Sequence, residues 1–150
     1  MYQFELACLI EMPNVRMLPP SDGLRSDLNN STRNCTVKIS NAQRDIHKLL
    51  LKMGLKTELE VSPFEDDMGG FLSIDIACRD KKLAIEFDGP SHFLSNGTHN
   101  GVTQFKTRLL KKLGWNIIRI PFREWAELSN GHGGKDERAG YLRNKIGDFK

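Results

Sequence analysis

Two short segments in the middle of the chain, residues 71–78 and 83–88, alternate apolar and polar side chains. The side chains of a β-strand point alternately to opposite faces, so a period of two predicts a strand in each segment. The residues between them, 79–82, are all charged and suit a short connection. The sequence therefore predicts a β-hairpin.

The same alternation predicts that three acidic side chains share one face of this hairpin. Asp75 is expected opposite an apolar face made of Leu72, Ile74 and Ile76. Glu86 and Asp88 are expected opposite Leu83, Ile85 and Phe87. Facing Cβ atoms in an antiparallel pair lie roughly 4.5–5.5 Å apart. The three carboxylates are therefore expected to lie close enough to repel one another.

A divalent cation is one way to remove this repulsion. Carboxylate oxygens are common ligands of Mg²⁺ and Mn²⁺, so Asp75, Glu86 and Asp88 form a candidate metal site. Together with His92, which could act as a general acid or bind a phosphate, the same acids form a candidate catalytic site. The structural alternative is that these acids are solvated or paired with lysines, and that His92 is an ordinary loop residue.

Around the hairpin, the chain has the pattern of a small α/β domain. Helices are expected at 41–53, where Ser40 and Gln43 suit a capping box, and at 103–113, 123–128 and 135–146. Further strands are expected at 56–61 and 115–121, and a loop at 89–101. Residues 1–39 show neither helical nor strand periodicity. The predicted division is an irregular N-terminal arm, 1–39, and a folded domain, 40–150.

Positive charge is concentrated toward the end of the chain. Residues 1–100 contain 11 Lys and Arg against 14 Asp and Glu, whereas residues 101–150 contain 11 against 5, giving +6. Such an imbalance favours a polyanionic partner, although the same cations could serve solubility alone. The candidate RNA-binding residues are Lys106, Arg108, Lys111, Lys112, Arg119 and Arg123. Trp115 and Trp125 could stack on bases, but their apolar neighbours favour the core.

Composition excludes several other classes of protein. No apolar run approaches the roughly 18 residues of a membrane span, so no membrane partner is expected. The cysteines, Cys8, Cys35 and Cys78, are odd in number and lack the spacing of a disulfide framework or a zinc site, which suits a reducing compartment. No organelle-targeting presequence is readable at the N-terminus.

The central motif resembles a known family. The segment 83–93, LAIEFDGPSHF, is similar to the core of the RAP domain, an RNA-binding domain abundant in apicomplexan proteins. Weaker matching positions extend the resemblance from about residue 71 to 145; they are 74–77, Gly101, Lys106, 108–110, 113–115, 120–122, Glu124, Trp125 and 141–142.

The resemblance implies a restriction-endonuclease-like fold, a mixed sheet flanked by helices, in which Asp75 and the Glu86–Asp88 pair would be the metal-binding acids. Asp88 stands where nucleases of this fold often have a lysine, so cleavage would require His92, Lys81 or Lys82 in its place. The resemblance also implies work on organellar ribosomal or messenger RNA in mitochondria or plastids, and of these the mitochondrion is the expected location.

We therefore weigh three hypotheses. The first is a non-catalytic RNA-binding protein of organellar RNA metabolism. Such a protein could be a component of the mitochondrial ribosome, with ribosomal proteins as partners, or a ribosomal-RNA maturation factor. The alternative is a metal-dependent RNA endonuclease that uses Asp75, Glu86 and Asp88. The third is a protein-interaction domain that has kept the fold without a nucleic-acid contact. The sequence does not name the RNA or the oligomeric state, nor say whether the chain is complete.

Overall fold

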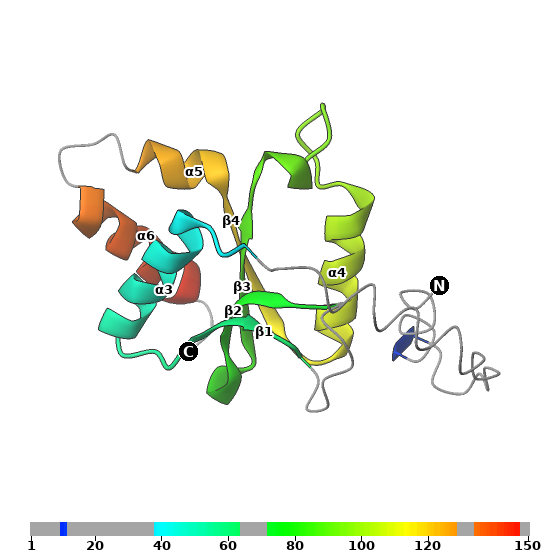
Figure 1. The fold of residues 1–150 in the computed structure, drawn as a ribbon, viewed down its shortest axis with the longest axis horizontal. Helices are drawn as coiled ribbons and strands as arrows, with labels where there is room; N and C mark the ends of the chain where they lie inside the picture. Colours follow the sequence, from blue (N-terminus) through cyan, green and yellow to red (C-terminus); the bar gives the residue numbers. More distant parts are fainter. Residues whose placement is uncertain (1–9, 12–37, 64–71, 129–133, 148–150) are drawn as a thin grey trace.

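A mixed four-stranded sheet forms the centre of the molecule (Figure 1). The computed structural model describes residues 10–11, 38–63, 72–128 and 134–147. The strands lie in the order β1 (Glu58–Val61), β2 (Ile74–Cys78), β3 (Leu83–Asp88) and β4 (Asn116–Pro121). β2 is antiparallel to both of its neighbours, β1 and β3, and β4 runs parallel to β3.

The predicted hairpin is the pair β2 and β3. Ile76 pairs with Ile85 and Cys78 with Leu83, and a 3-10 turn, η1 (Arg79–Lys81), connects the two strands. The chain reverses at Lys82, which has a left-handed backbone with φ of 48°. The connection is therefore as short as the charged linker predicts.

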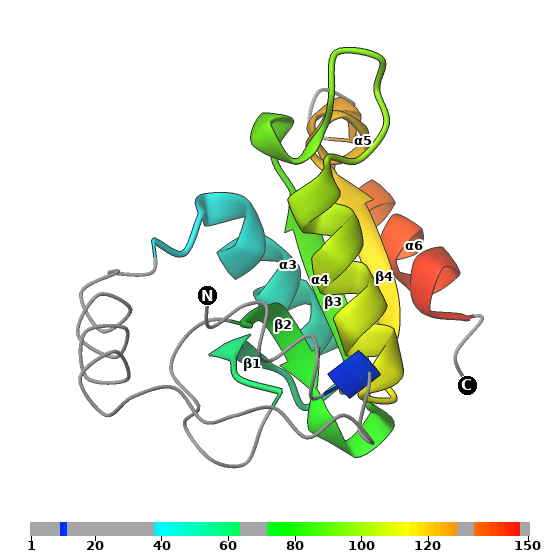
Figure 2. The ribbon, with the colours of Figure 1, turned by 90° about the vertical axis from the view of Figure 1, so that its right-hand side faces the viewer.

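A helix crosses from β3 to the parallel strand β4. After the 3-10 turn η2 (Pro90–His92), α4 (Gly101–Lys112) begins at Asn100, whose side chain accepts a hydrogen bond from the Thr103 amide. A parallel pair needs such a crossover, because a tight turn cannot return the chain to the starting edge. In Figure 2, α4 lies in front of β3 and β4.

The remaining helices cover the opposite face of the sheet. They are α3 (Asn41–Lys52), α5 (Phe122–Glu127) and α6 (Gly134–Gly147). Figure 1 shows α3 and α6 on one side of the sheet and α4 on the other. The apolar core is accordingly divided: Leu109 and Leu110 of α4 pack on Ala77 and Ala84, and Ile46 and Leu50 of α3 pack in a second cluster with Ile85.

The start of α3 has the predicted capping box. The Ser40 hydroxyl accepts from the Gln43 amide at 3.1 Å, and the Gln43 side chain accepts from the Ser40 amide at 2.6 Å. These bonds satisfy amide groups that the first turn of a helix leaves without a carbonyl partner.

Ser40→Ala is expected to lower the free energy of unfolding by about 1 kcal/mol, because the Gln43 amide loses its acceptor. Urea unfolding followed by circular dichroism measures this loss, and Ser40→Thr, which keeps the hydroxyl, is the control. A loss as large in the threonine variant would contradict the capping role.

Most expected elements are present with bounds shifted by one to three residues, and Trp115 and Trp125 are core residues, 3% and 4% exposed. One expectation was wrong. Leu72 and Ile74 pack in the cluster on the α4 side, whereas Ile76 packs in the other cluster. Leu72 precedes the strand, which begins at Ile74, so the alternation does not reach it. Ile74 is the first residue of the strand and pairs with Val61, which belongs to the α4-side cluster. Except for residues 10–11 and 38–39, the predicted arm, 1–39, lies outside the described residues.

Candidate functional site

The three acidic side chains of the hairpin face α4. Glu86 and Asp88 are buried, 1% and 0% exposed, and Asp75 is about 15% exposed at its side chain. One Asp75 oxygen accepts a hydrogen bond from the Phe87 amide at 2.8 Å, which ties the side chain of β2 to the backbone of β3. The strands thus bring together the acids that the alternation predicts.

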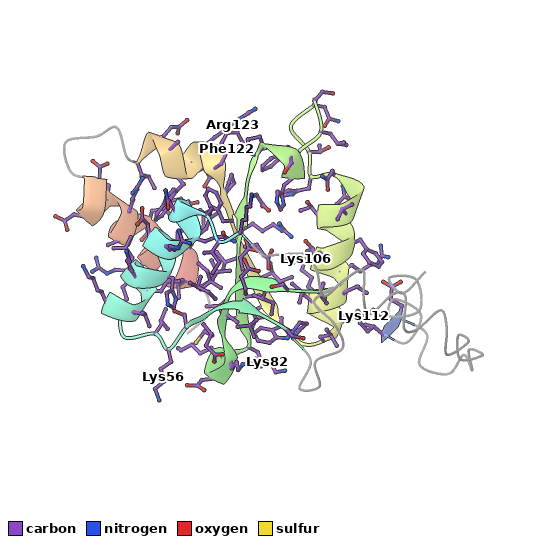
Figure 3. All side chains as sticks on the ribbon, in the orientation of Figure 1. Lys56, Lys82, Lys106, Lys112, Phe122 and Arg123 are labelled. Atoms are coloured by element: carbon purple, nitrogen blue, oxygen red, sulfur yellow. The ribbon has the colours of Figure 1, made fainter. Side chains whose placement is uncertain are left out.

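Lys106 of α4 balances the first two acids. Its ammonium group donates a hydrogen bond to Glu86 and lies 3.8 Å from Asp75. In Figure 3, Lys106 lies between α4 and the sheet. A lysine does stand beside the acids, but it comes from the helix rather than from Lys81 or Lys82, which are exposed at the hairpin turn.

Arg119 of β4 balances the third acid. Its guanidinium group is hydrogen bonded to Asp88 and donates to the Thr107 hydroxyl at 2.7 Å and 3.2 Å. Two histidines complete the surroundings of Asp88: His99 Nε2 lies 3.0 Å and His92 Nδ1 3.2 Å from its oxygens. His92 therefore sits beside the acid, as a catalytic or a structural residue would.

Glu86 is the least satisfied member of this cluster. Its Oε1 atom has no hydrogen-bond partner among the described residues, although the carboxyl group is buried. Burial raises the pKa of Glu86 to about 7, and the charge of Lys106 opposes this rise. A carboxyl group that titrates near neutral pH is a feature of functional sites, and also of structural ion-pair networks.

Glu60 is a fourth acid that the sequence reasoning missed. It adopts a left-handed backbone with φ of 51°, rare for a residue other than glycine. Its carboxylate accepts from Ser73 at 2.7 Å and from Gln43 at 3.2 Å. Burial raises the pKa of Glu60, and the nearby Asp75 adds to this rise. No residue pattern identifies it, because its position depends on the backbone.

The arrangement of these residues does not fit Mg²⁺ or Mn²⁺ as it stands. Lys106 and Arg119 hold the oxygens that would ligate an ion, and a cation between Asp75 and Glu86 would lie next to the Lys106 ammonium group. Within residues 10–11, 38–63, 72–128 and 134–147, no group of three or more His, Cys, Asp or Glu is placed to hold a metal ion. The metal site stays a prediction.

The candidate RNA-binding cations are divided between the interior and the surface. Lys106 and Arg119 take part in the buried ion pairs, whereas Arg108, Lys111, Lys112 and Arg123 are exposed. Arg108 is paired with Glu11. Figure 3 shows Lys112 at the far end of α4 and Arg123 near the start of α5. An RNA-binding role for all six stays a prediction.

Comparison with protein families identifies the C-terminal part of the chain. The model of the RAP domain matches residues 85–145. These residues form a RAP domain. The RAP domain begins within β3 and ends within α6, so it contains Glu86, Asp88, His92, Lys106 and Arg119, while Asp75 precedes it. The predicted start of the domain at residue 40 stays a prediction.

Two relatives match part of this chain. A chloroplastic RAP domain-containing protein of Oryza sativa subsp. japonica is 36% identical over 109 residues, 72% of this chain and 16% of the relative. The human mitochondrial FAST kinase domain-containing protein 3 is 34% identical over 83 residues, 53% of this chain and 12% of the relative. The chain thus spans less than a fifth of either relative. None of the helices in the described segments is both long and apolar enough to span a bilayer.

Proposed function

We propose that this chain binds RNA without cleaving it, through the exposed cations of α4. The observation that carries the proposal is the solvent face of this helix, where Lys111 and Lys112 are exposed beside Arg108, which pairs with Glu11, and where the helix itself contains no acidic residue. Exposed lysines of this kind neutralise phosphates and release their counterions. The match to the RAP domain adds support, because resemblance to that domain implies RNA binding.

The buried cluster supports a structural role for the acids in this proposal. Each carboxylate of the hairpin has a cationic partner from α4 or β4, so the cluster attaches the helix and the edge strand to the hairpin. Holding α4 in this way fixes the direction of its exposed cations. RNA binding then depends on the acids only through the position of the helix.

The double variant Lys111→Gln/Lys112→Gln is expected to weaken binding of single-stranded RNA and to reduce its salt dependence. Each lost phosphate contact removes roughly 0.7 from the slope of log affinity against log salt, so the slope should fall by roughly 1 to 2. Fluorescence anisotropy with a labelled oligonucleotide at several salt concentrations measures both quantities.

The matched control is Lys48→Gln/Lys52→Gln, which removes the same charge from exposed positions of α3 on the opposite face. The control is expected to change affinity only slightly. Equal effects of the two double variants would show that net charge, and not the α4 face, governs binding. Absence of RNA binding at low salt would refute the proposal.

The cellular setting we propose is an organelle, with ribosomal or messenger RNA as the partner. The support is that one relative is named chloroplastic and the other mitochondrial, and we favour the mitochondrion. Cross-linking in cells followed by sequencing of the bound RNA tests this: organellar transcripts are expected. Co-sedimentation with assembled ribosomes would favour a ribosome component, and recovery with precursor RNA a maturation factor.

Cleavage of RNA is the second candidate function. It is favoured by the Glu86 carboxyl group, which is buried beside Lys106 and has one oxygen that no described residue hydrogen bonds. Incubation with RNA and Mg²⁺ or Mn²⁺, with Glu86→Gln as the control, separates the two functions. Cleavage by the natural chain that the variant lacks would replace our proposal with the nuclease.

A further inference from the structure

Two pockets lie beside the loop that joins β3 to α4. The first, of about 210 Å³, is lined by Phe93, Gly97, Pro121, Arg123 and Glu124. The second, of about 360 Å³, is lined by His99, Gln104, Thr107, Arg108, Lys111 and Arg119. The first has an aromatic ring and proline in its wall. The second has four basic side chains in its wall: Arg119 and His99 contact Asp88, Arg108 contacts Glu11, and Lys111 has no acidic partner among the described residues.

A stacked pair of rings connects the two pockets. Phe93 lines the first and His99 the second, and their ring centroids are 4.8 Å apart with an angle of 26° between the planes. The ring of Phe122 lies 6.3 Å from that of Phe93, and the Arg123 guanidinium group lies over Phe122 at 5.6 Å. An aromatic pocket and a cationic pocket are therefore immediate neighbours.

The loop that carries Phe93 and His99 is held in place by hydrogen bonds between its own backbone groups. Phe93 and His99 form a β-bridge, the Leu94 amide donates to the Thr98 carbonyl at 2.7 Å, and the Asn100 amide donates to the His92 carbonyl at 2.8 Å. Gly97 closes the turn with φ of 83°, which favours glycine. The walls of both pockets thus exist before any ligand binds, which lowers the ordering cost of binding.

From this arrangement we propose that the two pockets form one site for an unstacked nucleotide of single-stranded RNA. The base enters the pocket at Phe93 and Arg123, because unpaired bases stack on aromatic rings and on guanidinium planes. An adjacent phosphate occupies the second pocket at Lys111 and His99. Duplex RNA keeps its bases stacked and paired, so it cannot fill the first pocket. This inference rests on the proposed RNA binding and specifies its substrate as single-stranded.

Phe93→Leu tests the aromatic pocket, since leucine keeps an apolar side chain and removes the ring face. The variant is expected to bind a single-stranded oligonucleotide roughly fivefold or more weakly and to bind duplex RNA of the same sequence as the natural chain does. Lys111→Gln is expected to cost more affinity than Lys112→Gln, which removes the same charge one residue outside the pocket. Lys48→Gln on α3 is the control for both.

Cross-linking of the natural chain locates the base without any substitution. An oligonucleotide with 4-thiouridine is irradiated on the protein, and the attached peptides are identified by mass spectrometry. Attachment within residues 93–99 or 121–124 is expected. Attachment confined to other segments would overturn the inference, even if the Phe93 variant failed to fold.

The remaining outcomes separate this inference from the proposed function. If the natural chain binds RNA and the Phe93→Leu and Lys111→Gln variants bind it equally well, the nucleotide site is wrong and RNA binding stands. Equal affinity of the natural chain for single-stranded and duplex RNA would also overturn the site. If the natural chain binds no RNA, both proposals fail together.

Discussion

Arg119→Met is expected to lower the free energy of unfolding by about 3–5 kcal/mol, because it leaves the Asp88 carboxylate buried without its guanidinium partner. Asp88 is fully buried, and Arg119 is hydrogen bonded to it and to the Thr107 hydroxyl. Methionine fills a similar volume, so the loss reports the charge more than the packing. Urea unfolding at neutral pH measures it.

The control for this change is Arg123→Met, which removes an exposed guanidinium group four residues away. Its effect on stability is expected to lie within about 0.5 kcal/mol. Equal losses in the two variants, or a loss below about 1 kcal/mol at Arg119, would show that the buried ion pair does not hold the strand to the hairpin.

Glu86→Gln is expected to remove part of the dependence of stability on pH. The pKa of Glu86 is raised from 4.5 to about 7 in the folded protein, mainly by burial. Between these values the folded state keeps a proton that the unfolded state has released, so the stability that this carboxyl group contributes is lost as the pH rises. The natural chain should therefore lose on the order of 2 to 3 kcal/mol relative to the glutamine variant between pH 4.5 and 7.5.

Unfolding in urea at a series of pH values gives the difference between the two proteins. Glu127→Gln, on the exposed face of α5, is the matched control for removal of a carboxylate. A parallel pH profile for the natural chain and Glu86→Gln would contradict the raised pKa. A gain in the stability of the natural chain over this window, relative to the variant, would mean that Lys106 outweighs burial.

Much of the fold could be predicted from local patterns. The period of two in the hairpin strands, the capping box at Ser40 and the helical spacing of Leu109 and Leu110 each describe neighbours along the chain. Such patterns depend on backbone geometry alone, which explains why the expected elements are found with shifted ends. They failed at Leu72, where the residue precedes the strand and the alternation no longer applies.

The partners of the acids were harder to predict, because they come from distant parts of the chain. Lys106 lies 20 residues from Glu86, and Arg119 lies 31 residues from Asp88. A signal did exist. Lys106 precedes Leu109 and Leu110 by three and four residues and so shares their inward face, and Arg119 alternates with the buried Ile118 and Ile120. The cations of this region therefore belong to two groups, one facing the sheet and one facing the solvent, and net charge alone does not distinguish them.

The strand order leaves β1 and β4 at the two margins of the sheet, where unpaired backbone groups could recruit a foreign strand. β4 carries the inward-pointing charge of Arg119 and ends in Pro121, which has no amide hydrogen to donate. β1 is only four residues long, and the left-handed backbone of Glu60 interrupts its regular course. Both margins thus have features that disfavour edge-to-edge aggregation, and the charge that fastens β4 to the hairpin also protects its open side.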